Sequence, residues 1–286
     1  MEPCELIEIK FKGQRRQLFK NPKKLSLQLG ELAVVEAEKG EDMGKVNLIG
    51  AKLEDDKDLD EIKTILRKPS KNDLAKYYAN KAEERKALEV CKEKVIKHKL
   101  NMNLIDCEFQ LDKNRITFYF TSENRVDFRE LVKDLARIYK TRIELRQIGV
   151  RDASCRLGGY GICGRPLCCS SWLRDFKPIP IQSAKDQSLP LSTAQLAGIC
   201  GRLKCCLIFE RDLYNEAIKK FPQLAQIVIT EKGEALVEHI DVFKEEVVLK
   251  FKDDHVEKHS INYLKDKLYN CDNGCHSNFE QQEYVN

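Results

Sequence analysis

The sequence predicts an α+β protein made of a small β meander, a helix plus an α/β layer, a Gly/Cys-rich loop region, and a C-terminal small β domain or barrel. Three observations lead to this fold class. Short apolar runs separated by turn residues occupy both ends of the chain. Apolar residues recur at three- and four-residue steps in the middle, from Asp73 onward. Six of the 12 cysteines fall between residues 163 and 206, where glycine is also frequent.

The N-terminal half is predicted to contain a β segment, a helix and a mixed layer. Residues 1–55 carry apolar runs at 6–9 and 32–35, which favours a β segment. Residues 56–100 are predicted to be a linker followed by a basic amphipathic helix, with Asp73 as its N-cap. Residues 101–150 show strand patterns at 104–111 and 115–120, a helical pattern at 128–138 and a strand pattern at 141–148. This order predicts an α+β layer with its helices on one face of a sheet.

The C-terminal half is predicted to be loop-rich and then β-structured. Residues 151–215 form the Cys-rich region. Residues 216–270 carry short strand patterns at 226–230, 235–239 and 246–251, which favour a small β domain or barrel. The polar tail, 271–286, is predicted to be flexible, and the role of its Cys271, Cys275 and His276 is left open.

Composition restricts the function classes. The 286 residues carry a net charge of only +4, which gives no whole-chain argument for nucleic-acid binding. No apolar run approaches the roughly 18 residues of a membrane helix, and the N-terminus has no export signal, so we expect a cytoplasmic protein without membrane insertion. In a reducing compartment, many cysteines favour metal binding or redox chemistry over structural disulfides.

The strongest motif is a duplicated nonapeptide. Residues 161–169 read Gly-Ile-Cys-Gly-Arg-Pro-Leu-Cys-Cys, and residues 198–206 read Gly-Ile-Cys-Gly-Arg-Leu-Lys-Cys-Cys. The offset is 37 residues, and seven of the nine positions are identical. The candidate metal ligands are the six cysteines of the two copies: Cys163, Cys168, Cys169, Cys200, Cys205 and Cys206.

The spacing suits thiolate ligation. A turn between the first cysteine and the cysteine pair can bring sulfurs toward one centre, and Gly164 and Gly201 permit the positive φ that such a turn needs. Arg165 and Arg202 place a positive charge near the sulfurs, which favours thiolates. If each cysteine pair is extended, its two side chains point to opposite sides.

Ligand counting leaves the metal open. A zinc site or a [4Fe–4S] cluster needs about four thiolates, and one copy of the motif supplies at most three. Six thiolates exceed one site and fall short of two, which suggests incomplete sites completed by another chain. Iron–sulfur is favoured because zinc sites more often use two-residue gaps, with zinc and reduced thiols as alternatives.

Three function classes follow from these motifs. With no P-loop, nucleophile elbow, zinc-protease motif or dinucleotide fingerprint, we expect a non-catalytic, cluster-binding accessory protein with no catalytic residues. The alternative is a zinc-stabilised nucleic-acid-binding module, supported by a basic run at Arg125, Arg129, Lys133, Arg137, Lys140, Arg142 and Arg146. A redox enzyme using vicinal cysteines is the third and least favoured class.

At these residues the sequence resembles the PSP (polymerase suppressor) C-terminal domain family, including its RicT/YaaT-like stage 0 sporulation proteins. The resemblance rests on residues 148–152, on 157–159, on both cysteine motifs and on the stretch 170–176. In the family pattern the ligands correspond to Cys163, Cys168, Cys169, Cys200 and Cys205, with Cys206 also matching. Ile162 departs from the family's more usual proline at that position.

The resemblance implies a regulatory role in RNA processing. Proteins of this kind act with RicA- and RicF-like partners and RNase Y in mRNA processing and maturation, which affects sporulation, competence and biofilm formation. Their complex carries [4Fe–4S] clusters, with a flavin only as part of the partner complex. Where such partners are missing, another protein or a homo-oligomer is expected to complete the clusters. Any contact with RNA is expected to be indirect.

Overall fold

The computed structural model describes residues 5–51, 61–173, 176, 178–187, 189, 190 and 192–268. The chain forms two compact units. Unit 1 comprises Met1–Phe176 with Ile199–Arg202, and unit 2 comprises Lys177–Gly198 with Leu203–Asn286. Helices, antiparallel sheets and one parallel strand pair occur together, so the predicted α+β class is confirmed.

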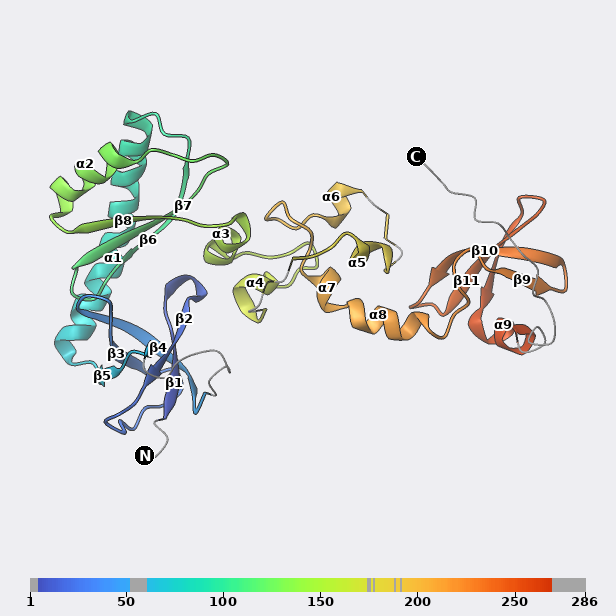
Figure 1. Cartoon of the computed structure of the whole chain (residues 1–286), viewed down its shortest axis with the longest axis horizontal. Coiled ribbons are helices and arrows are strands. Elements are labelled where there is room, and N and C mark those ends of the chain that lie inside the picture. The colour runs from blue at the N-terminus through green and yellow to red at the C-terminus, as the bar shows by residue number, and fades with distance from the viewer. Residues whose placement is uncertain are drawn as a thin grey trace. The chain divides into compact units, whose positions relative to one another are not determined.

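Unit 1 begins with a five-stranded sheet (Figure 1). Its strands are β1 (Leu6–Lys10), β2 (Arg16–Lys20), β3 (Leu32–Glu36), β4 (Glu41–Ile49) and β5 (Ile65–Arg67), in the order β2-β1-β4-β3-β5. The turn between β1 and β2 holds the short 3-10 helix η1 (Lys12–Gln14). Strand β5 lies within the residues that were predicted to begin as a linker. It is part of the sheet because Ile65 is fully buried beside β3.

Helix α1 (Lys71–Lys97) starts one turn earlier than the sequence indicated. Ser70 is the N-cap, and Asp73 occupies the third helical position, so the prediction of Asp73 as N-cap is wrong. The Ser70 hydroxyl accepts from the Asp73 N–H, and the Asp73 carboxylate accepts from the Ser70 N–H at 2.8 Å. This reciprocal pair is a capping box, which explains why Asp73 looked like a helix start.

The α/β layer follows α1. Strands β6 (Asn103–Phe109) and β7 (Arg115–Thr121) form an antiparallel hairpin, α2 (Arg129–Tyr139) crosses over, and β8 (Arg142–Gln147) pairs in parallel with β7. Apolar residues of both helices pack against the middle strand in one buried cluster, which includes Cys91, Leu131 and Phe118. Both helices therefore contribute to a single core against this sheet, as the periodicity predicted.

Short helices occupy the cysteine-rich region. They are α3 (Val150–Leu157), α4 (Cys168–Ser171), α5 (Gln182–Lys185), α6 (Thr193–Leu196), α7 (Cys206–Phe209) and α8 (Arg211–Ile218). Among the helices in the described ranges, none has the length and apolar character that a membrane span requires.

Unit 2 ends in an open sheet (Figure 1). Strands β9 (Ile227–Thr230), β10 (Gly233–Asp241), β11 (Glu246–Phe251) and β12 (Val256–Ser260) lie in the order β12-β11-β10-β9, and α9 (Ile261–Leu268) follows. The outer strands do not pair with each other, so the barrel alternative is wrong and the small β domain is confirmed. The tail residues Cys271, Cys275 and His276 lie outside the described residues.

Candidate metal-binding cysteine loops

The two cysteine motifs fold into the same local structure. We define loop 1 as residues 159–171 and loop 2 as residues 196–208. Tyr160 forms an isolated antiparallel bridge with Pro166, and Ala197 forms the equivalent bridge with Leu203. The bond from Leu167 N to Gly159 O, 3.0 Å, also has its counterpart 37 residues later, from Lys204 N to Leu196 O, again 3.0 Å. The sequence duplication is thus a structural duplication.

Each loop turns at the glycine that follows its first cysteine. Gly164 has φ +72° and Gly201 has φ +74°, in the left-handed region where side chains are strained. A Cβ at either position would meet nothing within 4 Å, so the dihedral angle and not crowding favours glycine there. In loop 1 the turn is tight, since Cys163 Sγ lies 3.3 Å from the Cβ position at residue 161.

Each cysteine pair starts a helical turn. Cys168 and Cys169 are the first residues of α4, while Cys205 has α-helical dihedral angles and Cys206 begins α7. The expectation of extended pairs with oppositely directed side chains is therefore wrong. Turn hydrogen bonds, from Ser170 N to Leu167 O and its counterpart in loop 2, wind the backbone at both places. Neighbouring side chains in a helical turn point about 100° apart around the helix axis. The two sulfurs of a pair are therefore not directed to opposite sides, as they would be in a strand.

The six candidate ligands differ in exposure. Cys163 is exposed, Cys169 is buried, and Cys168, Cys200, Cys205 and Cys206 are half-buried. Cys163, Cys168, Cys169 and Cys200 belong to unit 1, and Cys205 and Cys206 belong to unit 2. Arg165 and Arg202 are exposed, and neither side chain pairs with a carboxylate in the described part of the chain.

The described residues do not form a complete metal site. No group of three or more His, Cys, Asp or Glu side chains within them is arranged to hold a metal ion. A tetrahedral zinc site or a [4Fe–4S] cluster needs about four ligands. Each loop supplies at most three cysteines, so metal binding by these loops stays a prediction that requires further ligands.

Cys155 is an additional thiol beside loop 1. It lies on α3, and its Sγ donates to the carbonyl oxygen of Cys169 at 2.9 Å. Burial raises the pKa of Cys155, so the thiol form is favoured. The contact attaches α3 to the second residue of the cysteine pair.

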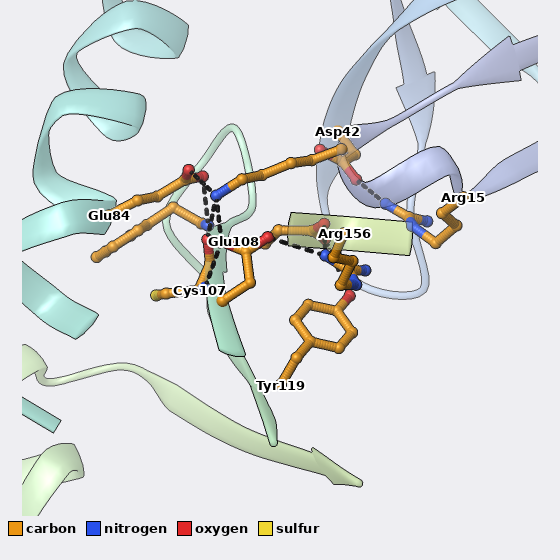
Figure 2. A network of polar contacts seen from close by, with 10 residues as sticks. Arg15, Asp42, Glu84, Cys107, Glu108, Tyr119 and Arg156 are labelled. Carbon is orange, nitrogen blue, oxygen red and sulfur yellow. Dashed lines mark hydrogen bonds and ion pairs between the residues drawn. The ribbon is translucent and has the colours of Figure 1, made fainter. Parts of the chain in front are cut away.

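A network of charged residues supports loop 1 from within unit 1 (Figure 2). The Arg156 guanidinium, on α3, donates to Asp106 Oδ2 at 3.1 Å and to Glu108 Oε1 at 2.8 Å. Its central carbon lies 3.4 Å from the centroid of the Tyr119 ring, and only 7% of the side chain is exposed. Burial and the neighbouring Glu108 raise the pKa of Tyr119 to about 12. Arg156 therefore ties α3 to β6 and β7.

Lys12 extends this network to the N-terminal sheet. Its Nζ, in η1, donates to Glu84 Oε2 at 2.7 Å, to Asp106 Oδ1 at 2.6 Å and to the carbonyl oxygen of Cys107 at 2.8 Å. Burial lowers the Lys12 pKa, but the bonds to the two carboxylates outweigh it and the net pKa is raised. The next residues of η1 also contact the loop 1 side, because Gln14 Nε2 donates to Ser170 O at 2.7 Å.

This network was not predicted from the sequence. Lys12 and Asp106 are 94 positions apart, and no local motif connects them. The only hint is Gly13, whose left-handed φ of +64° and lack of a Cβ allow Arg156 to approach closely.

The predicted basic run is partly neutralised by neighbouring acids. On α2, Lys133 pairs with Glu130 at 2.8 Å, and Arg137 lies 3.5 Å from Asp134. Arg129, the first residue of α2, lies 3.9 Å from Asp127. These pairs fit a solvated helix face better than a continuous nucleic-acid interface.

Comparison with known proteins defines the class. Residues 63–148 match the PSP1 C-terminal conserved region, and residues 178–221 match the third domain of PSP1-like proteins. The first match covers β5, α1 and the α/β layer, and the second covers all of loop 2. The chain belongs to the PSP1 family.

Within that family the chain is similar to a bacterial protein. It is 41% identical to stage 0 sporulation protein YaaT of Bacillus subtilis (strain 168) over 239 residues, which is 84% of this chain and 87% of YaaT. An uncharacterized protein of Schizosaccharomyces pombe is 35% identical over 164 residues, 47% of this chain and 22% of its own length. Protein PSP1 of Saccharomyces cerevisiae is 51% identical over 49 residues, 17% of this chain and 6% of its own. No solved structure matches the chain.

Proposed function

We propose that this chain is a non-catalytic regulatory protein whose cysteine loops hold a [4Fe–4S] cluster together with ligands from a partner. The structural duplication of loops 1 and 2 carries the proposal. Two loops with the same bridge, the same left-handed glycine and the same helical cysteine pair form a repeated ligand module. A packing role alone explains neither the exposed Cys163 nor the repetition of three cysteines in each loop.

The shortage of ligands supports a shared site. Each loop offers at most three thiolates, and the described residues gather no set of three metal-binding side chains. A partner chain that supplies the missing ligands makes cluster binding and complex formation a single event. The partners are RicA- and RicF-like proteins where the source organism has them, and otherwise another protein or a second copy of this chain.

The similarity to YaaT supports the biological part of the proposal. The two proteins are similar over most of both chains, which favours a role in development for this chain as well. In this proposal the chain acts in the cytoplasm with RNase Y in mRNA processing and maturation, affecting sporulation, competence and biofilm formation. A flavin belongs only to the partner complex, and RNA is contacted indirectly.

A complementation experiment tests this role. The chain is expressed in Bacillus subtilis lacking YaaT, and sporulation frequency, processing of RNase Y-dependent transcripts and proteins that co-purify under anaerobic conditions are measured. The proposal predicts that the wild-type chain and the Cys91→Ala control restore sporulation and processing and capture partners. Cys200→Ser, at the same cellular level, is expected to lose these properties. The proposal would be contradicted if Cys200→Ser restored sporulation and processing as well as the wild-type chain does. It would also be contradicted if the wild-type chain restored sporulation while transcript processing stayed as in the strain lacking YaaT.

Zinc is the alternative metal, because cysteine thiolates also ligate zinc. A zinc-stabilised nucleic-acid-binding module would bind RNA directly, with a steep loss of affinity as salt rises. Stoichiometric zinc together with such binding by the purified chain would favour this alternative over the cluster.

A further inference from the structure

Unit 1 contains a cavity next to loop 1, and most of its lining residues have no part in the proposed cluster chemistry. Its volume is about 600 Å³, within the usual range of small-molecule sites. Its wall is built by η1, β2, α3 and the segment around α4, with contributions from β7 and β8. Cys169 of loop 1 and Cys155 both line it.

The cavity wall carries more positive than negative charge. Its arginines are Arg15, Arg16, Arg146 and Arg156, and its carboxylates are Glu8 and Asp152. Four positive and two negative charges leave a surplus of two. The carboxylates that bind Arg156, namely Asp106 and Glu108, are not part of this wall.

Several of these arginines retain hydrogen-bonding capacity. Within the described residues, the Arg146 side chain makes neither a hydrogen bond nor an ion pair. Arg15 donates to Asp42 at 3.2 Å, but its Nε has no partner. Arg16 lies 3.5 Å from Glu8 and makes no hydrogen bond through Nη1. Guanidinium groups with unused donors bind phosphate oxygens well, because the planar fork matches two oxygens at once.

The rest of the wall suits an organic ring. Ile148, Leu173 and Phe176 supply aromatic and aliphatic surface. The Tyr119 ring also lines the cavity, with the Arg156 guanidinium stacked on it. A ligand with two negative charges and a flat ring would use both kinds of wall.

We propose that this cavity binds a nucleotide, a nucleoside mono- or diphosphate, with its phosphates on Arg146 and Arg16. Because Cys169 lines the same cavity, a bound nucleotide contacts the base of loop 1. The site then makes the cysteine loop responsive to a small molecule. This assignment is independent of the metal, since no cluster ligand is needed to hold the phosphates.

Isothermal titration calorimetry on the full-length chain tests the assignment, with AMP, ADP and inorganic pyrophosphate as separate titrants. Saturable binding of AMP or ADP that weakens with added salt is expected, and pyrophosphate should bind more weakly because it makes no ring contacts. Arg146→Met should weaken nucleotide binding by about tenfold or more, the loss of one charge-assisted contact, and Arg146→Lys should lie between the two. Arg129→Met, an arginine with 87% of its side chain exposed, is the matched control and should bind like the wild type.

Unchanged far-UV circular dichroism and thermal unfolding of Arg146→Met would show that the fold is intact. The proposal is overturned if neither AMP nor ADP binds, or if Arg146→Met binds them as tightly as the wild type. Binding of a single-stranded RNA oligonucleotide with no binding of either mononucleotide would overturn it as well.

Discussion

The guanidinium of Arg156 stacks on the ring of Tyr119, with its central carbon 3.4 Å from the ring centroid. The same side chain bridges Asp106 and Glu108, so one residue of α3 secures the helix that leads into loop 1. The stability of unit 1 and the placement of its cysteine loop therefore depend on a shared group of contacts, and this can be tested.

Arg156→Met is expected to destabilise the protein by about 3–5 kcal/mol, because it removes one partner of a buried ion pair. Glu108 then has no ion-pair partner in the described part of the chain, and Asp106 keeps only Lys12. Urea unfolding followed by circular dichroism measures this change. Arg129→Met, at an exposed position, should change the free energy of unfolding by less than about 0.5 kcal/mol. An equally small change for Arg156→Met would show that the network does not stabilise unit 1.

Gly13→Ala is expected to destabilise the chain more than Gly164→Ala. Both glycines have left-handed φ values, +64° and +72°, so both alanines incur about 1–2 kcal/mol of backbone strain. Only at Gly13 would the new Cβ lie 2.5 Å from Arg156 Cζ, whereas at Gly164 it meets nothing within 4 Å. Thermal unfolding of the two variants isolates the steric contribution. Identical losses of stability would mean that Arg156 moves aside at no cost.

Ser70→Ala removes the hydroxyl that accepts from the Asp73 N–H at the start of α1. The expected loss is about 1 kcal/mol, the usual value of a helix N-cap. Chemical denaturation provides the measurement, and Ser70→Thr is the control, since threonine keeps the hydroxyl and should retain most of the stability. If Ser70→Ala is as stable as the wild type, the capping box contributes nothing.

Asp73 should make stability depend on pH in acid. Hydrogen bonds from Arg67 and Ser70 hold the pKa of Asp73 below its ordinary value of 3.8. A depressed carboxyl pKa stabilises the fold above 3.8, and this contribution is lost as the pH falls below 3.8 toward the folded-state pKa. The stability difference between wild type and Asp73→Asn should thus be constant from pH 7 to about pH 5 and shrink in stronger acid. If this stability difference instead grew as the pH fell, the pKa of Asp73 would not be lowered in the folded protein, and the prediction would be wrong.

Local signals in the sequence predicted most of the elements. The periodicity of 128–138 and the alternation around 115–120 correspond to α2 and β7, because each pattern reflects one face packed on a common core. The duplicated motif predicted a repeated loop with glycine at its turn, which depends only on nearby residues.

Contacts between distant residues could not be predicted in this way. Ser70 was missed as the cap because Asp73 is also a favourable cap residue, and only the reciprocal bonds distinguish their positions. The sequence also did not show that the turn of loop 1 ends at Leu167, so that a helical turn begins at Cys168. The Lys12, Asp106 and Arg156 contacts join η1, β6 and α3, and no single-sequence pattern encodes such a meeting.

The cluster hypothesis is tested most directly by the iron and acid-labile sulfide content of the chain purified anaerobically, with its visible absorption spectrum. The Cys91→Ala control alters a buried thiol of the α1 core. Wild-type protein and this control are predicted to have the same iron content and the same sulfide content, and both should absorb in the visible range. Cys163→Ser combined with Cys200→Ser, which changes the first cysteine of each loop, is predicted to lose both. A colourless wild-type protein with stoichiometric zinc, or a double variant that keeps its full iron content, would contradict the account.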